Sequence, residues 1–134
     1  MSLILRTALF LSLAASSLPA AELGGIWTGL MPGRNGTKQD VAFQFKMKGQ
    51  ILTGTLFGDE FDLPIQDAAI TGDKVQFSVT TTNYYNGSKI TFAYTGTIAG
   101  DSMELTRERI LKPGEKPPEH ESLKQTFVLK RLVP

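Results

Sequence analysis

The residues of this chain best suited to bind a charged group are two arginines in its last third. Arg107 and Arg109 continue the alternation that Met103 and Leu105 begin. Side chains two residues apart in a β-strand lie on the same face, so both guanidiniums are predicted to point into the interior or to its rim. A guanidinium stays charged and carries five hydrogen-bond donors, so it needs a carboxylate, backbone carbonyls or a ligand as its partner there.

Two interpretations of Arg107 and Arg109 stay open. If a protein carboxylate meets them, the pair is structural, and Glu60 and Asp62 at a predicted hairpin tip are the candidates. If none does, the acidic or polar head group of a ligand is the better explanation. A β-bulge that reverses the register, or a strand end that lets both side chains reach solvent, is the alternative to an inward orientation.

A second candidate binding feature is Asn83-Tyr84-Tyr85-Asn86, at the tip of a predicted hairpin. An exposed tyrosine beside an asparagine offers an apolar ring and hydrogen-bonding groups, which is a common recognition chemistry. Tyr84 and Tyr85 are therefore candidate ligand-binding residues together with the arginines. The alternative is that at least one of the two folds down as a lid over the end of the domain.

Composition gives little support to catalysis or metal binding. The chain has one histidine, His120, which lies between two glutamates, and it has no cysteine. These counts exclude a histidine metal triad, a thiol nucleophile and disulfides. The acidic residues between positions 59 and 62 lack the ligand series of a calcium loop. We therefore predict a protein that is not an enzyme and that uses no metal or cofactor.

These candidate residues are predicted to lie on β-strands and their turns. The apolar side chains at every second position are clearest in two runs: Val75, Phe77 and Val79, then Ile90, Phe92 and Tyr94. The turn pairs Gly72-Asp73, Asn86-Gly87 and Gly100-Asp101 separate the runs. Strict alternation with such turns predicts a meander of antiparallel strands with one buried and one hydrated face.

Similar patterns extend the meander through most of the chain. We expect eight strands, at residues 25–31, 41–47, 51–57, 63–71, 74–82, 88–99, 102–109 and 123–132. Gly54 is expected to mark a bend or bulge, and Pro64 an irregular strand start. The short turns favour a single up-and-down antiparallel β-barrel of about eight strands, which leaves no free edge. A sandwich or jelly roll is the alternative, although it needs longer crossing connections.

The first residues have the pattern of a secretory signal peptide. Arg6 precedes an apolar run, and small residues follow up to Ala20 and Ala21. We predict a signal peptide at residues 1–21, a barrel domain at residues 22–134, and a periplasmic or secreted location. The apolar run is shorter than the ~20 residues of a membrane helix, so the mature form is not expected to insert into a membrane.

The charge of the mature chain is predicted to be balanced. Of 14 basic and 13 acidic residues, cleavage removes Arg6 alone, which leaves 13 of each. A formally neutral surface gives no reason to expect nucleic acid or an anionic membrane as a partner.

Gly25-Ile26-Trp27, at the start of the first expected strand, resembles the lipocalin and wider calycin signature. The resemblance implies that Trp27 plugs one end of the barrel and that a basic residue of the last strand packs across it. Arg131 shares the parity of Phe127 and Leu129, so it is the residue that matches. Gly25, Trp27 and Arg131 are thus the expected structural signature.

The whole mature chain also resembles a recurrent small exported bacterial domain that is lipocalin-like and has no settled activity. The matching motifs are Trp27-Thr28-Gly29, Leu52-Thr53-Gly54, Pro64-Ile65 and the paired Gly-Asp turns. The chain is shorter than a typical lipocalin and shows no helix before its last strand. A ligand cavity is therefore not carried over from the resemblance.

Two functions of different class follow from the sequence. The first is an exported binding protein without catalytic activity that holds a small apolar or amphiphilic ligand in its barrel. The alternative is a secreted interaction module that binds a protein or a glycan through its loops, with the barrel core filled. The interior volume discriminates between them, since an eight-stranded barrel either holds one small ligand or is filled by side chains.

Overall fold

The computed structural model describes residues 21–33, 36–58, 61–83, 85–118 and 122–134, so most of the predicted signal peptide lies outside it. The described residues form nine strands: β1 (Gly25–Pro32), β2 (Lys38–Lys48), β3 (Ile51–Leu56), β4 (Leu63–Pro64), β5 (Gln66–Thr71), β6 (Lys74–Thr82), β7 (Lys89–Ala99), β8 (Ser102–Ile110) and β9 (Lys124–Val133). The predicted all-β class is confirmed. No helix in the described ranges is long and apolar enough to cross a membrane.

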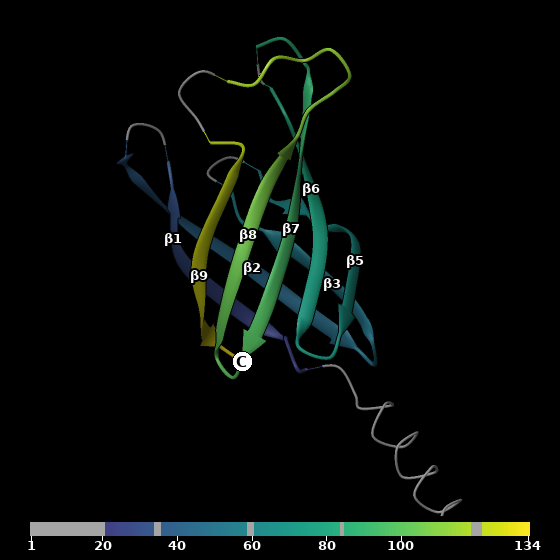
Figure 1. The fold of residues 1–134 in the computed structure, drawn as a ribbon. Coiled ribbons are helices and arrows are strands. Elements are labelled where there is room, and N and C mark those ends of the chain that lie inside the picture. The colour runs from purple at the N-terminus through teal and green to yellow at the C-terminus, as the bar shows by residue number, and fades with distance from the viewer. Residues whose placement is uncertain (1–20, 34–35, 59–60, 84, 119–121) are drawn as a thin grey trace, which may run out of the picture.

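All nine strands belong to one antiparallel sheet, in the order β4-β3-β2-β1-β9-β8-β7-β6-β5. Apart from β4 and β5, each strand pairs with its neighbours along the chain, and the first long strand, β1, pairs with the last, β9. The strands curl so that β2 and β3 lie behind β6, β7 and β8 (Figure 1). A single sheet with this order excludes the sandwich and jelly-roll alternative, because those folds pack two sheets face to face.

The hydrogen-bond ladder of the sheet is not closed, and its two edges are consecutive along the chain. Leu63 and Pro64 of β4 pair with β3, whereas β5 pairs with β6. Only Ile65 separates β4 from β5, and its backbone N–H donates to the Gly54 carbonyl oxygen at 3.0 Å. The expected single strand at residues 63–71 is therefore two strands, which raises the number from eight to nine.

A bulge at the start of β5 is the physical reason for this break. The register between β5 and β6 shifts between Gln66 and Ala69, and Asp67 adopts a φ of 52°. This left-handed backbone conformation is uncommon for a residue other than glycine, although aspartate adopts it more readily than most. The chain thus turns away from β3 and toward β6 within a few residues.

The bulge expected at Gly54 is absent. β2 and β3 pair in unbroken register there, with Gly54 opposite Phe45. Glycine is needed at this position because neighbouring atoms come close to it. A Cβ here would lie 2.5 Å from the Gln44 carbonyl oxygen and 3.3 Å from the Ile65 side chain. Gly54 therefore lets the chain around β4 come near β3.

Aromatic rings fill the middle of the interior. Phe43 and Phe45 of β2 meet Phe77 of β6 and Tyr94 of β7, which lie on the opposite side of the curled sheet (Figure 1). The Phe77 and Tyr94 rings stack at 4.9 Å, and the Phe43 and Tyr94 rings meet edge to face at 5.6 Å. Such pairs stabilise the core by ~0.5–1.5 kcal/mol each beyond their area burial.

Candidate functional site

The register of β8 decides where the two predicted arginines point. β8 pairs with β7 and β9 without a shift, so the bulge that would reverse the arginines does not occur. Arg107 lies opposite Tyr94, and Arg109 lies opposite Phe92. Tyr94 is buried at 2% exposure. Cross-strand partners share a face, so both arginines are on the interior side, as the alternation predicted.

Arg107 is half-buried and contacts neutral groups. Its guanidinium lies 4.5 Å from the centre of the Phe92 ring, and it donates a hydrogen bond to the Gln125 side-chain oxygen. Within the described ranges, no carboxylate forms an ion pair with this guanidinium. Its positive charge is therefore solvated by a ring and an amide, and no described anion balances it.

Tyr94 is the third neutral group beside Arg107. Burial raises the pKa of the Tyr94 phenol, while the charge of Arg107 and its hydrogen bond to the phenol oppose that shift. The phenol is therefore uncharged at neutral pH. The Tyr94 phenol therefore keeps its proton, and a neutral phenol can both donate and accept a hydrogen bond.

Arg109 has a protein carboxylate as its partner. Its Nη2 lies 2.8 Å from the Glu115 Oε2, and both side chains are partly buried. The prediction that Asp62 is the partner of the arginines was wrong, since its carboxylate accepts from the Gly58 N–H at 3.3 Å. The other predicted partner, Glu60, lies outside the described residues. The Nε of Arg109 is buried and has no hydrogen-bond partner among the described residues.

A tight turn holds Glu115 against Arg109. Lys112-Pro113-Gly114-Glu115 closes with a 2.9 Å hydrogen bond from the Glu115 N–H to the Lys112 carbonyl oxygen, and Gly114 has a φ of 81°. Proline followed by a glycine with positive φ is the pattern of a type II turn. The Glu115 Oε1 also accepts from the Lys112 N–H at 2.9 Å.

This geometry stabilises the ionised form of Glu115. The Lys112 N–H lowers the pKa of the Glu115 carboxyl most, followed by the hydrogen bond from the Arg109 side chain. Of the two interpretations of the arginines, Arg109 therefore has the structural partner, whereas Arg107 does not.

The β6–β7 turn, which carries Asn83 and Tyr85, lies at the end of the sheet where β8 ends, because Thr82 pairs with Lys89 and Thr91 pairs with Ile110. Figure 1 shows β6 and β8 running to the same end. The Asn83 side-chain oxygen accepts from the Tyr85 N–H at 2.8 Å and orders this hairpin. Tyr85 is 95% exposed, so it does not fold down as a lid. Tyr84 lies outside the described residues.

The signature residues Gly25, Trp27 and Arg131 meet at the opposite end. Trp27 is fully buried, and the Arg131 guanidinium lies 4.7 Å from the centre of its ring. Gly25 has a φ of 123°, and a Cβ there would lie 2.2 Å from the Val133 carbonyl oxygen. The contact that the lipocalin resemblance implies between Trp27 and Arg131 is present.

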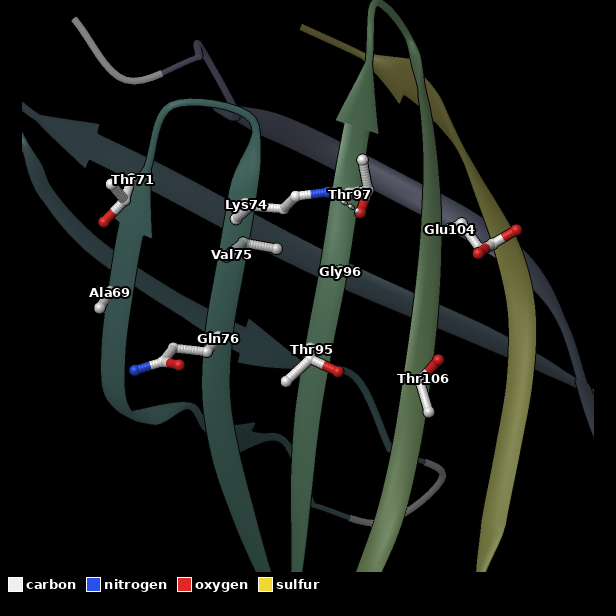
Figure 2. Close-up of a pocket in the computed structure, with 10 residues that line it drawn as sticks. All are labelled: Ala69, Thr71, Lys74, Val75, Gln76, Thr95, Gly96, Thr97, Glu104 and Thr106. Atoms are coloured by element: carbon white, nitrogen blue, oxygen red, sulfur yellow. Dashed lines mark hydrogen bonds between the residues drawn. The ribbon is translucent and has the colours of Figure 1, made fainter. Parts of the chain in front are cut away.

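A pocket on the outer face of the sheet was not predicted. It has a volume of about 420 Å³ and lies over β5, β6, β7 and β8 (Figure 2). We call it the outer pocket; its lining residues are Ala69, Thr71, Lys74, Val75, Gln76, Thr95, Gly96, Thr97, Glu104 and Thr106. In the parts of the chain that the structure describes, no group of acidic or histidine side chains is arranged to hold a metal ion, and His120 falls outside those parts.

Comparison of the chain with protein-family models, with curated proteins and with solved structures found no match. The resemblance to lipocalins therefore rests on the signature residues and their positions. Sequence reasoning missed Glu115 and Gln125 as partners of the arginines. The sequence holds a signal for each of these two residues. Glu115 ends a segment with turn residues, Lys112-Pro113-Gly114-Glu115, and Gln125 lies two residues before Phe127 and so on the same face of the strand.

Proposed function

We propose that this protein is a binding protein, without catalytic activity, that takes a small anionic amphiphile at the sheet end carrying Arg107. The observation behind this proposal is the half-buried guanidinium of Arg107, whose described contacts are all neutral. A partly buried charge without a counter-charge is costly. A ligand carboxylate or similar anion would balance it with charge-assisted hydrogen bonds.

The neighbours of Arg107 suit both parts of an amphiphile. The head group receives hydrogen bonds from the guanidinium and the proton of the Tyr94 phenol. The apolar tail lies beside Phe92, which is half-buried and packs against the core. The ring cluster of Phe43, Phe77 and Tyr94 keeps the tail close to the rim, because it occupies the space below.

This function is proposed for a lipocalin-like, up-and-down barrel whose ladder is interrupted beside β4 and β5. The proposal includes export of the mature chain, residues 22–134, to the periplasm or the outside of the cell after removal of the predicted signal peptide.

A second function is favoured by the same ring cluster. If the rings fill the interior completely, the protein is an interaction module that binds a protein or a glycan at its surface. The exposed Tyr85 at a hairpin tip supports this alternative, because exposed tyrosines are frequent anchors at interfaces.

Displacement of a bound fluorescent probe, N-phenyl-1-naphthylamine, tests the first proposal. Dodecanoate and dodecanol have the same tail, so the difference in their affinities reports the head group. We expect the wild type to bind dodecanoate more tightly than dodecanol. Arg107→Gln should lower the affinity for dodecanoate by about tenfold or more and leave the affinity for dodecanol unchanged.

Lys130→Gln is the matched control, because Lys130 is a cation of the outer face that contacts Ser102. It should leave both affinities unchanged. Equal affinity of the wild type for the acid and the alcohol, or no displacement by either, would contradict the proposal and favour the surface alternative.

A further inference from the structure

The geometry of the outer pocket points to a second binding site, and we propose that it binds a neutral glycan. The pocket lies on the opposite face of β7 from the ring of Tyr94, so it is separate from the Arg107 site. The inference does not depend on the amphiphile proposal.

Two rows of outward side chains cross the four strands of the outer pocket in register. One row is Ala69, Gln76, Thr95 and Thr106, and the other is Thr71, Lys74, Thr97 and Glu104. Neighbouring members of a row are ~4.8 Å apart at the backbone, and the rows are ~7 Å apart along the strands. The result is a regular grid of side chains, polar at every position except Ala69, on a hydrogen-bonded sheet.

Short side chains line much of the outer pocket. β7 contributes the short side chains of Thr95 and Thr97, and Figure 2 shows Thr95 between the longer Gln76 of β6 and the equally short Thr106 of β8. Lys74 of β6 reaches over to Thr97 of β7, and Gln76 and Glu104 are the other long side chains of the lining (Figure 2). The volume of about 420 Å³ is within the range of small-ligand sites.

The polar groups of the outer pocket match hydroxyl-rich ligands. Threonine hydroxyls and the Gln76 amide both donate and accept hydrogen bonds, as sugar hydroxyls do. The backbone groups under the pocket are engaged in the sheet ladder, so recognition falls to the side chains. The Lys74 ammonium is held by a 3.0 Å hydrogen bond to the Thr97 hydroxyl, which fixes its direction before a ligand arrives.

The charges of the outer pocket select against ionic ligands. Lys74 and Glu104 are the charged residues of the lining, and their charges cancel. A polyanion would meet Glu104, and a polycation would meet Lys74. A metal ion would find a single carboxylate, which is fewer ligands than such a site needs. The methyl groups of the threonines add small apolar contacts for the C–H groups of a sugar ring.

Titration of the full mature chain with maltotriose, cellotriose and triacetylchitotriose, followed by amide NMR spectra, tests this inference. We expect saturable shifts with at least one of these sugars, confined to amides of residues 69–76, 95–97 and 104–106. Thr95→Val removes a hydroxyl at constant shape, and Lys74→Ala removes the oriented ammonium. Each substitution should lower the affinity for that sugar by about tenfold, which is the effect of losing a well-placed hydrogen bond.

Lys130→Ala is the control, since Lys130 and Ser102 form a similar amine–hydroxyl pair on the same face outside the pocket. It should leave sugar binding unchanged, and all variants should keep the wild-type spectrum because these residues are on the hydrated face. Absence of saturable shifts with every sugar, or shifts that map elsewhere, would overturn the inference. Stronger binding of inorganic phosphate at Lys74 would overturn the ligand class.

Discussion

Arg131 links three parts of the molecule through one guanidinium. Its Nη1 donates to the Gly24 carbonyl oxygen at 2.6 Å, and its Nη2 donates to the Glu22 carbonyl oxygen at 2.8 Å. Its Nε forms a 2.9 Å ion pair with Asp101. The flat face of the same group covers Trp27. Only arginine offers donors in several directions around a planar group that also stacks on a ring.

Replacement of Trp27 by alanine is expected to destabilise the protein by about 3–5 kcal/mol, as truncations of large buried aromatic residues do. The ring is fully buried, and its Nε1–H donates to the Leu23 carbonyl oxygen at 2.8 Å. Trp27→Phe is the control, because it retains part of the ring contact and should cost less. A loss below about 1 kcal/mol in urea unfolding would be inconsistent with a buried plug.

The pair of Arg109 and Glu115 is expected to make stability depend on pH in the acid range. The pKa of Glu115 is lowered in the folded protein from its ordinary value of 4.5. The unfolded chain therefore binds a proton more readily, and stability rises with pH through this window. The contribution is complete above pH 4.5 and is lost as the pH falls through the lower folded-state pKa.

Glu115→Gln isolates this contribution in urea unfolding at a series of pH values. The difference in unfolding free energy between wild type and variant should be constant near neutral pH and should shrink below pH 4.5. A difference that stays constant down to the acid limit would mean that Arg109 does not engage the carboxylate in solution.

At the scale of elements, the alternation of apolar and polar residues predicted most of the strands, because each strand has one buried and one hydrated face. β6, β7 and β8 begin and end within a residue or so of their expected bounds. The break between β4 and β5 was not predictable in the same way. It depends on the backbone of Asp67 and on the approach of Ile65 to Gly54, which arise only when distant strands meet.

The partners of Arg107 and Arg109 could not be predicted from the sequence for a related reason. The alternation of residues along the strand identified the face on which Arg107 and Arg109 lie, because alternation is a local property of a single strand. The choice of Glu115 over Asp62 depends on how the chain between β8 and β9 folds back, and that is not encoded in alternation. The outer pocket likewise needs the register of four strands, which sequence spacing does not determine.

Gly114 offers a test of the turn between β8 and β9. Gly114→Ala should destabilise the protein by about 1 kcal/mol or more, because a non-glycine residue is strained at a φ of 81°. No atom lies within 4 Å of the added Cβ, so backbone strain alone is tested. Gly114→Asn is the control and should cost less, since asparagine tolerates this conformation. Equal stability of all three proteins in thermal unfolding would contradict a type II turn.

At the scale of the whole molecule, the residues before β1 close the end opposite Arg107. Leu23 is fully buried, and the Ala21 N–H donates to the Gly72 carbonyl oxygen at 2.8 Å. The carbonyl groups of Glu22 and Gly24 hold Arg131. This short segment thus connects the start of the sheet with its last strand and with the β5–β6 turn.

Removal of residues 21–24 should therefore destabilise the domain by about 2–5 kcal/mol, the range for losing one large buried aliphatic side chain. A chain that starts at Ala21 and one that starts at Gly25 would be compared by urea unfolding. Leu23→Ala in the longer chain is the control that separates the side chain from the backbone contacts. Equal stability of the two chains would show that the segment does not close this end.

The proposed binding of an anionic amphiphile is tested most directly by a crystal structure with bromine-labelled dodecanoate, because the bromine locates the tail independently of the head group. We expect the carboxylate within hydrogen-bonding distance of the Arg107 guanidinium and the Tyr94 hydroxyl, with the tail beside Phe92. A carboxylate bound away from Arg107, or a tail on the outer face of the sheet, would contradict this account.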